Sequence, residues 1–165
     1  MAGRITKSEQ QLRPDPRYGD KILSKFINCI MLDGKKNAAR KVMYSAMDLI
    51  DERLKKEGGS EGAPKNALEL FHRAIDNVKP DVEVRSKRVG GANYQVPMPV
   101  TAKRRQSLGF RWLIVAVRGE SGKPMHIRLA KELWDAAQGD GKAMNVRDQT
   151  HRMADANKAF AHFAW

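Results

Sequence analysis

Residues 82–100 constrain the fold more than any other part of the chain, because they read as two short strands in a sequence that is otherwise helical. Two runs of alternating residues flank the pair Gly90-Gly91, which is the pattern of a β-hairpin. The second run contains Pro97 and Pro99, and proline cannot donate to a β-ladder, so this strand must lie at a sheet edge. A lone two-stranded ribbon is only marginally stable in water. Such a segment is better explained as an arm that lies on a partner.

The chain carries a large excess of positive charge, which favours a polyanionic partner. It has 31 basic and 19 acidic residues, a net charge of +12. The excess lies in residues 1–41, with ten basic and four acidic residues, and in residues 79–118, with nine basic and two acidic. The hairpin contributes Arg85, Lys87 and Arg88 to the second block. Two basic blocks on a near-neutral background indicate a nucleic-acid contact surface.

Apolar periodicity predicts a mainly α fold: a six-helix, bundle-like body with one protruding two-stranded β-hairpin and an extended basic N-terminal arm. Residues 1–19 have little apolar content and form the arm, whereas residues 20–165 form a single helical domain. The expected helices run from Asp20 to Gly34, from about Lys36 to Gly58, from Pro64 to Pro80, from Thr101 to about Arg118, through Leu129 and Ala137 to Gly139, and from Asn145 through Phe163.

The same spacing predicts the buried faces of the last three helices. The fourth helix should bury Leu108, Trp112, Val115 and Ala116. The fifth should bury Leu129, Ala130, Leu133, Trp134 and Ala137. The sixth should begin with a capping box of Asn145 and Asp148 and should bury Met153, Ala156, Phe160 and Phe163.

The fourth helix carries a second basic cluster directly after the hairpin. Lys103, Arg104 and Arg105 stand in its first turn, where cations oppose the helix dipole at a cost of about 0.3–1 kcal/mol. Arg104, Arg111 and Arg118 recur at intervals of seven residues and therefore share one face of the helix. This stripe can follow an RNA strand, and a solvated charge run is the alternative.

Tyr94, in the second strand of the hairpin, has two interpretations. It could stack on an unpaired base, an interaction worth about 1–3 kcal/mol. Its neighbours on the same face of the strand are Val96, Met98 and Val100, which are all apolar. Packing of the hairpin onto the rest of the protein is therefore an equally good interpretation.

The sequence contains no pattern of catalytic or metal-binding residues. Gly34-Lys35-Lys36 resembles the end of a phosphate-binding loop, but Cys29 stands where the first glycine should be. The four histidines lack metal-ligand spacing, and a single cysteine cannot form an internal disulfide. No apolar run approaches the ~20 residues of a membrane span. We therefore expect no enzymatic activity, no cofactor, no metal and no membrane association, in a cytoplasmic setting.

Four long segments are more distinctive than any of these patterns. They are PDPRYG at 14–19, FINCIMLDGKK at 26–36, NVKPDVEVRSKRVGGANYQVP at 77–97 and HRMADANKAFAHFAW at 151–165. Through them, nearly all of residues 12–165 resembles the small-subunit ribosomal protein family numbered seven, in its bacterial form. The resemblance implies a primary rRNA-binding protein that binds the 3′ major domain of small-subunit rRNA and nucleates assembly of the head. It also places the hairpin and the last helix near the exit-site tRNA and the mRNA path.

The resemblance assigns a role to each basic group. The rRNA-binding residues would be Arg4, Lys7, Arg13, Arg17, Lys35, Lys36, Arg104, Arg105 and Arg111, to which the helical stripe adds Arg118. The residues of the hairpin near tRNA and mRNA would be Arg85, Lys87, Arg88, Gly90, Gly91 and Tyr94. Arg152 and Lys158 would contact tRNA or a neighbouring protein of the head or platform. The chain would act as a single copy and not as a homo-oligomer.

A DNA-architectural protein is the main alternative, because a basic β-arm on a helical body can also bend a duplex. Such arms usually carry an apolar wedge or a proline at the tip, whereas this tip is Gly90-Gly91-Ala92-Asn93. An RNA-modifying enzyme is a third class, but the sequence offers no residues to carry the reaction.

Overall fold

The computed structural model describes residues 11–57 and 64–164. Within these residues the chain is mainly helical, with one two-stranded antiparallel hairpin, which confirms the predicted fold class. The elements in chain order are α2 (Lys21–Ile30), α3 (Lys36–Glu57), α4 (Ala67–Val78), β1 (Val82–Val89), β2 (Ala92–Pro99), α5 (Ala102–Arg118), α6 (Met125–Ala137), α7 (Lys142–Ala156) and the 3₁₀ helix η1 (Lys158–Phe163).

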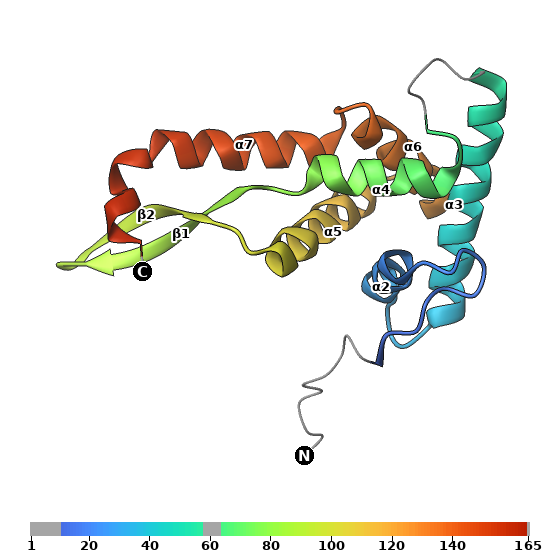
Figure 1. Ribbon diagram of the computed structural model, residues 1–165, viewed down its shortest axis with the longest axis horizontal. Helices are drawn as coiled ribbons and strands as arrows, with labels where there is room; N and C mark the ends of the chain where they lie inside the picture. Colours follow the sequence, from blue (N-terminus) through green and yellow to red (C-terminus); the bar gives the residue numbers. More distant parts are fainter. Residues whose placement is uncertain (1–10, 58–63, 165) are drawn as a thin grey trace.

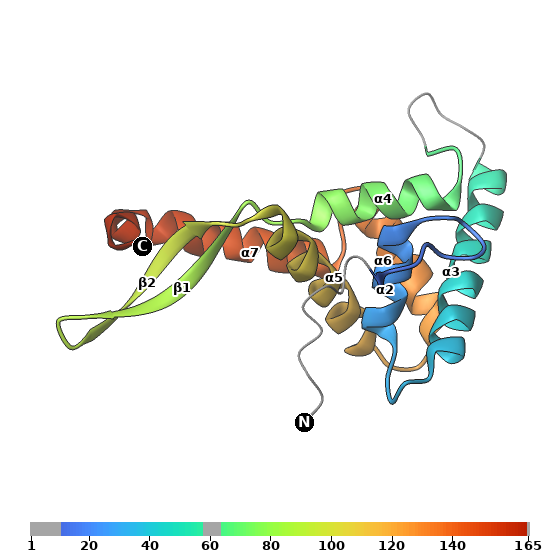
Figure 2. The ribbon, with the colours of Figure 1, turned by 60° about the horizontal axis from the view of Figure 1, so that its bottom comes forward.

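The described residues form a helical body and an elongated wing. Helices α2 to α6 gather into the body, and the hairpin projects from it on the opposite side from α3 (Figure 1). Helix α7 leaves the body in the same direction as the hairpin and runs beside it in both ribbon views (Figures 1 and 2). We call the hairpin, α7 and η1 together the wing.

A cluster of three phenylalanines joins the helices of the body. The ring centroid of Phe26 in α2 lies 5.4 Å from that of Phe71 in α4 and 5.1 Å from that of Phe110 in α5, both edge to face. All three side chains are fully buried, and truncating such a residue to alanine costs about 3–5 kcal/mol. The predicted stripe of α6 is also confirmed, since Leu129, Ala130, Leu133, Trp134 and Ala137 are all buried.

Helix α4 begins later than the sequence predicted. Pro64 was expected at its first position, but the helix starts at Ala67. The side chain of Asn66 fixes this start by accepting a hydrogen bond of 2.8 Å from the backbone N–H of Glu69. A proline at the first position merely lacks a backbone N–H, whereas a capping side chain accepts a hydrogen bond from one. The cap therefore determines where the helix begins.

Helix α5 begins after Thr101 as predicted, but its buried face is rotated from the predicted one. Leu108 is buried, and Trp112 and Ala116 are half-buried. Val115 was expected in the core and is 62% exposed. The centre of the buried face is formed by Leu113, with Gly109, Phe110, Ile114 and Val117 around it.

The start of α7 is a second correction, because Asn145 and Asp148 do not form its cap. The helix begins at Lys142, and Asn145 lies within it. Its cap comes from Glu132 of α6, whose buried carboxylate accepts a hydrogen bond of 2.8 Å from the N–H of Ala143. Gly141 precedes the helix with φ at 102°, and a Cβ there would lie 3.1 Å from the Glu132 carboxylate. Helix α6 thus determines where α7 starts.

The predicted last helix is in fact two elements. Helix α7 ends at Ala156, and residues 158–163 form η1. Met153, expected in the core, is 52% exposed, and Ala156 is exposed as well. The chain changes direction at Asn157, so Phe160 and Phe163 turn towards the hairpin instead of continuing the face of α7.

The hairpin has the predicted strands and turn. Its register pairs Val82 with Pro99 at the base, Lys87 with Tyr94, and Val89 with Ala92 next to the turn. Gly90 and Gly91 have φ of 57° and 89°, the left-handed conformation that a two-residue hairpin turn of type I′ requires at both positions. Residues with a side chain adopt this pair of conformations only with strain, which explains the glycine pair.

Substitutions of Glu132 test its capping role. Glu132→Ala removes the acceptor for the N–H of Ala143 and should lower the free energy of unfolding by about 0.5–2 kcal/mol. Glu132→Gln keeps an oxygen acceptor and removes a buried charge, so its stability near neutral pH should match or exceed that of the wild type. Chemical denaturation measures both, and an equal loss in the two variants would contradict the assignment.

The pH dependence of stability provides a further check on Glu132. Burial raises the pKa of Glu132, partly offset by the hydrogen bond from Ala143. The stabilising contribution of the protonated form is complete below the unfolded pKa of about 4.3 and is lost as the pH rises through the higher folded pKa. The wild-type free energy of unfolding should therefore fall across this range relative to that of Glu132→Gln.

Candidate nucleic-acid interface

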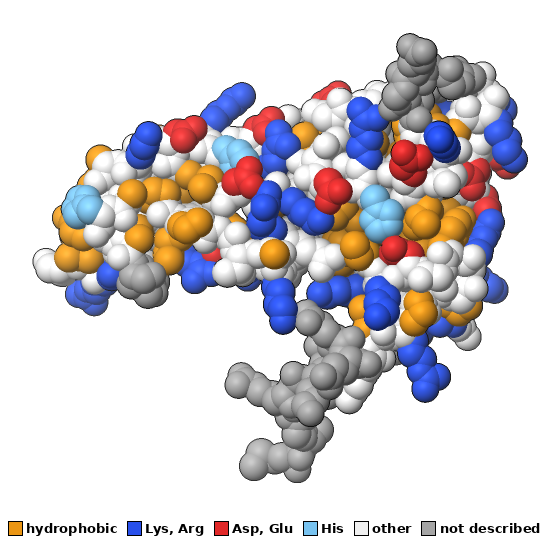
Figure 3. All heavy atoms as spheres, viewed as in Figure 1, with side chains coloured by type: hydrophobic (Ala, Val, Ile, Leu, Met, Phe, Trp, Pro, Cys, Tyr) orange, Lys and Arg blue, Asp and Glu red, His pale blue; other side chains and the backbone are white. Residues whose placement is uncertain are grey.

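The solvent face of α5 carries the predicted basic stripe. Arg111 and Arg118 are exposed and Arg104 is half-buried, on the side of the helix opposite the buried Leu113. Arg118 lies 14 positions after Arg104, which is about 21 Å along the helix at 1.5 Å per residue. Lys and Arg side chains are visible along the lower edge of the molecule, below α5 and α2 (Figure 3). The stripe therefore extends from the base of the hairpin to the far end of α5.

The end of the stripe next to the hairpin is tied to β1 by a buried carboxylate. Glu83 is 8% exposed, and Oε2 accepts a hydrogen bond of 3.1 Å from Nε of Arg104. Arg85, on the same strand, forms an ion pair with the other carboxylate oxygen. Burial alone would raise the pKa of Glu83, but the hydrogen bonds from Arg104 and Arg85 outweigh it, and the pKa is lowered. The charged pairing therefore stabilises the fold above pH ~4.3 and weakens as the pH falls through the lower folded pKa.

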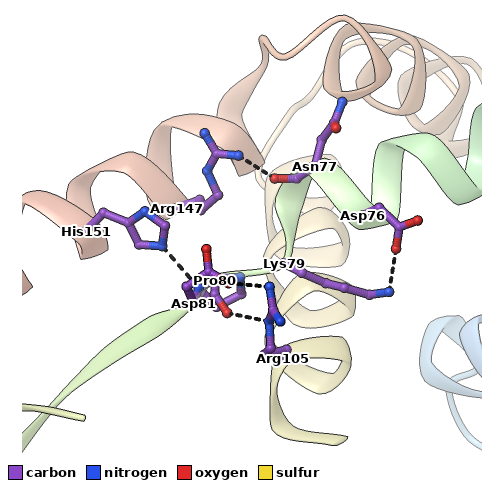
Figure 4. A network of polar contacts seen from close by, with 8 residues as sticks. All are labelled: Asp76, Asn77, Lys79, Pro80, Asp81, Arg105, Arg147 and His151. Carbon is purple, nitrogen blue, oxygen red and sulfur yellow. Dashed lines mark hydrogen bonds and ion pairs between the residues drawn. The ribbon is translucent and has the colours of Figure 1, made fainter. Parts of the chain in front are cut away.

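Arg105 fastens the same junction from the other side of α5. Its Nε donates a hydrogen bond of 3.1 Å to the carbonyl oxygen of Pro80, and its guanidinium forms an ion pair with Asp81 (Figure 4). The carboxylates of Asp81 and Glu83 therefore compensate the cations at the start of α5. This gives Arg104 and Arg105 structural partners, and their binding to RNA stays a prediction.

The other end of the stripe meets the end of α2. Arg118 donates a hydrogen bond of 3.0 Å to the carbonyl oxygen of Ile30, the last residue of α2. Lys25 of α2 donates one of 3.2 Å to the side chain of Gln106 in α5, so the two helices lie side by side. Lys35 and Lys36 follow in the turn after α2, with Lys35 exposed and Lys36 half-buried. The structure therefore places these two predicted residues at the same end of α5 as Arg118.

The described part of the predicted arm contacts the body instead of standing free. Asp15 is 3% exposed and accepts hydrogen bonds from the N–H groups of Arg17 and Tyr18 and from the hydroxyl of Tyr44 in α3. Arg17 pairs with Asp48 of α3 at 2.5 Å, and its guanidinium lies 5.1 and 5.4 Å from the ring centroids of Tyr18 and Tyr44. Residues 14–19 thus bind the chain to α3.

The other residues predicted for the arm differ in what the structure says of them. Arg13 is exposed, next to the bound segment 14–19. Arg4 and Lys7 lie outside the described residues, and their binding to rRNA stays a prediction.

The hairpin residues divide into a fastened group and an exposed tip. Lys87 donates a hydrogen bond of 2.8 Å to the carbonyl oxygen of Phe163 in η1. The ring of Tyr94 packs against two rings of η1, with centroid distances of 5.1 Å to Phe160 and 5.2 Å to Phe163. Of its two interpretations, the structure shows packing. Arg88, Gly90 and Gly91 remain exposed at the tip.

The last predicted site residues lie on the wing, away from the α5 stripe. Arg152 is exposed on α7, and Lys158 is exposed at the start of η1. The structure therefore separates the site residues into the α5 and α2 surface on the body and a second group on the wing.

Sequence reasoning missed the residues that attach the wing to the body. Arg147 of α7 donates a hydrogen bond of 2.5 Å to the carbonyl oxygen of Asn77, and Nε2 of His151 accepts one of 3.2 Å from the N–H of Asp81 (Figure 4). Asn77 also donates to the carbonyl oxygens of Ala136 and Ala137 in α6. These bonds join residues about 60–70 positions apart, and no local spacing signals them.

Residues 11–57 and 64–164 contain no group of three or more His, Cys, Asp or Glu side chains that could hold a metal ion. No helix in these two ranges has both the length and the apolar character needed to cross a bilayer.

Comparison with known proteins decides the family. Residues 2–158 match the family described as ribosomal protein S7p/S5e. The chain belongs to this family. It is 53% identical to small ribosomal subunit protein uS7 of Rhodopirellula baltica over 163 residues, which cover 99% of each chain. It is 50% identical to uS7 of Hyphomonas neptunium and 49% identical to uS7 of Magnetococcus marinus, each over the full length of both chains.

Membership in this family identifies the chain as a structural constituent of the small ribosomal subunit. The family is one of ribosomal proteins and not of enzymes. The resemblance found in the sequence is thereby confirmed. This membership implies ribosomal RNA and other ribosomal proteins as partners of the chain.

Two variants of α5 separate the structural arginines from the exposed ones. Arg105→Ala removes the bonds to Pro80 and Asp81, so hydrogen exchange should accelerate at the N–H groups of Asp81 and Val100 at the base of the hairpin. Global stability should fall by less than about 1 kcal/mol, because the ion pair is partly exposed. Arg111→Ala, on the same helix, should leave this exchange unchanged. Equal rates of hydrogen exchange in both variants would contradict the structural role of Arg105 at the base of the hairpin.

Proposed function

We propose that the chain is a primary rRNA-binding protein that binds the 3′ major domain of small-subunit rRNA and nucleates assembly of the head. The observation that carries this proposal is the exposed basic face of α5, which Lys35 and Lys36 continue at the end of α2. Cations spaced along about 21 Å of one rigid helix can contact successive phosphates of an RNA strand. Each phosphate that is neutralised releases counterions from the RNA, which favours binding.

The basic residues can be ranked as RNA ligands by whether they already form hydrogen bonds within the protein. Arg111 and Lys35 are exposed and are the strongest candidates for direct phosphate contacts, followed by Lys36 and Arg13. Arg104, Arg105, Arg118 and Arg17 each hold a protein acceptor. A guanidinium has five N–H donors, so these four can bind a phosphate with the donors that remain. Arg4 and Lys7 complete the proposed set.

We further propose that the wing reaches towards the exit-site tRNA and the mRNA. Among its predicted site residues, Arg85, Arg88, Gly90 and Gly91 are exposed on the hairpin, as are Arg152 on α7 and Lys158 on η1. Backbone at a glycine turn can approach an RNA strand closely, because no Cβ intervenes. Arg152 and Lys158 are also proposed to face a neighbouring protein of the head or platform. We expect the protein to act in the cytoplasm and not as a homo-oligomer.

Two matched pairs of lysines test the rRNA-binding surface. Lys35→Ala/Lys36→Ala removes the cations at the end of the α5 stripe. Lys55→Ala/Lys56→Ala removes the same charge from the exposed last turn of α3, about 28 Å along that helix. The first pair should weaken binding to a 3′ major domain fragment and lower the slope of log K against log salt by about 2. The second pair should change neither.

The wild type provides the reference for this experiment. If about 6–10 phosphates are neutralised, its affinity should fall roughly 10³–10⁵-fold between about 50 and 200 mM salt. Equal losses in the two lysine pairs would contradict the location of the surface. A preference for duplex DNA over the rRNA fragment at equal salt would favour the DNA-architectural alternative.

Substitution of Arg88 tests the proposed division between body and wing. Arg88→Ala should leave affinity for the rRNA fragment unchanged, because the α5 surface is intact. It should weaken retention of exit-site tRNA on reconstituted ribosomes. Arg88→Lys keeps the positive charge and should retain most of the tRNA. Loss of rRNA binding in Arg88→Ala would show that the hairpin belongs to the primary site.

A further inference from the structure

A cluster of aromatic rings fastens the hairpin far from its base. Tyr94 of β2 lies 5.1 Å from Phe160 and 5.2 Å from Phe163, and the two phenylalanine rings are stacked at 6.4 Å. All three side chains are half-buried, against each other. We call this cluster the ring seam. Aromatic pairs of this kind stabilise a contact beyond the effect of the area that they bury.

The other strand is fastened at the same level. Lys87 pairs with Tyr94 in the register of the hairpin, and its Nζ donates a hydrogen bond of 2.8 Å to the carbonyl oxygen of Phe163. Residues of both strands therefore contact the same short 3₁₀ helix. Only the pairs Arg88–Asn93 and Val89–Ala92 separate this level from the glycine turn.

The base of the hairpin is held separately. Arg105 binds Pro80 and Asp81 from α5, and His151 of α7 accepts the N–H of Asp81 (Figure 4). Lys87 lies six positions after Asp81, which is about 20 Å along the strand at 3.3 Å per residue. The hairpin is thus held at its base and again near its tip, and α7, which also packs against both strands, connects these two attachments.

We propose that η1 is the element that sets the direction of the hairpin tip, with Phe160 and Phe163 as positioning residues. A ribbon of two strands has no core to resist bending, so an attachment at its base alone leaves its tip free to swing. A tilt of ~10° about the base moves the end of a ~26 Å strand by roughly 4–5 Å. The second attachment removes this freedom. Lys87 and Tyr94 then act by holding the hairpin, not by contacting RNA.

This inference rests on the proposed function only in its consequence, that a fixed tip presents Arg88 and the glycine turn to RNA at one place. The geometric claim itself concerns the free protein. It can therefore fail while rRNA binding stands, and it can stand if rRNA binding fails.

Distances between two spin labels test the claim in the full chain. Cys29→Ser provides the background, and Ser45→Cys on α3 and Asn93→Cys beside the tip carry the labels, since both positions are exposed. The parent should give one narrow distance distribution. Phe160→Ala/Phe163→Ala should broaden it by roughly 4–5 Å or more, as the tilt of the strand requires. Phe160→Tyr/Phe163→Tyr keeps both rings and should restore the narrow distribution.

Two further variants complete the experiment. Met153→Ala truncates an exposed apolar side chain of α7 outside the ring seam and should leave the distribution unchanged. Lys87→Met keeps the aliphatic stem, removes the donor to Phe163 and should broaden the distribution less than the double alanine variant. A narrow parental distribution in Phe160→Ala/Phe163→Ala, with the helical content intact, would overturn the proposal. Affinity for the rRNA fragment, measured on the same samples, reports separately on the proposed function.

Discussion

The carboxylate of Glu83 lies almost fully buried where the hairpin leaves the helical body, between the guanidinium groups of Arg85 and Arg104. Removing both arginines would leave this buried carboxylate without a compensating charge, which is costly. The junction therefore tolerates little separation of β1 from α5. This contact fixes the base of the hairpin to the start of the α5 stripe, because it joins β1 to α5.

The same junction explains what the basic residues of the sequence do. The cluster at the start of α5 looks unfavourable when only the helix dipole is considered, which suggested an external anion. Asp81 and Glu83 supply that negative charge from within the chain. Local spacing could not reveal this, since the acids lie about 20 residues earlier. The same is true of Arg17, because its ion-pair partner Asp48 lies on another element.

Much of the fold follows from short-range patterns. Apolar stripes located α2, α3 and α6, and the glycine pair located the hairpin turn, because these features depend on neighbours within a few residues. The failures share one cause. Glu132 caps α7 from another helix, the buried face of α5 is chosen by the helices around it, and the turn at Asn157 directs Phe160 to Tyr94. Each depends on a tertiary contact that competes with the local signal.

The residues that meet where η1 holds the hairpin are far apart in the sequence, so they are synthesised at different times. A ribosome makes the chain from its N-terminus, and domains fold as their residues emerge. Strands β1 and β2 are complete long before η1, since the bond from Lys87 to Phe163 spans 76 positions. The α5 stripe also precedes η1 in the chain. During synthesis the helix that carries the stripe can therefore be in place before η1 emerges to hold the hairpin.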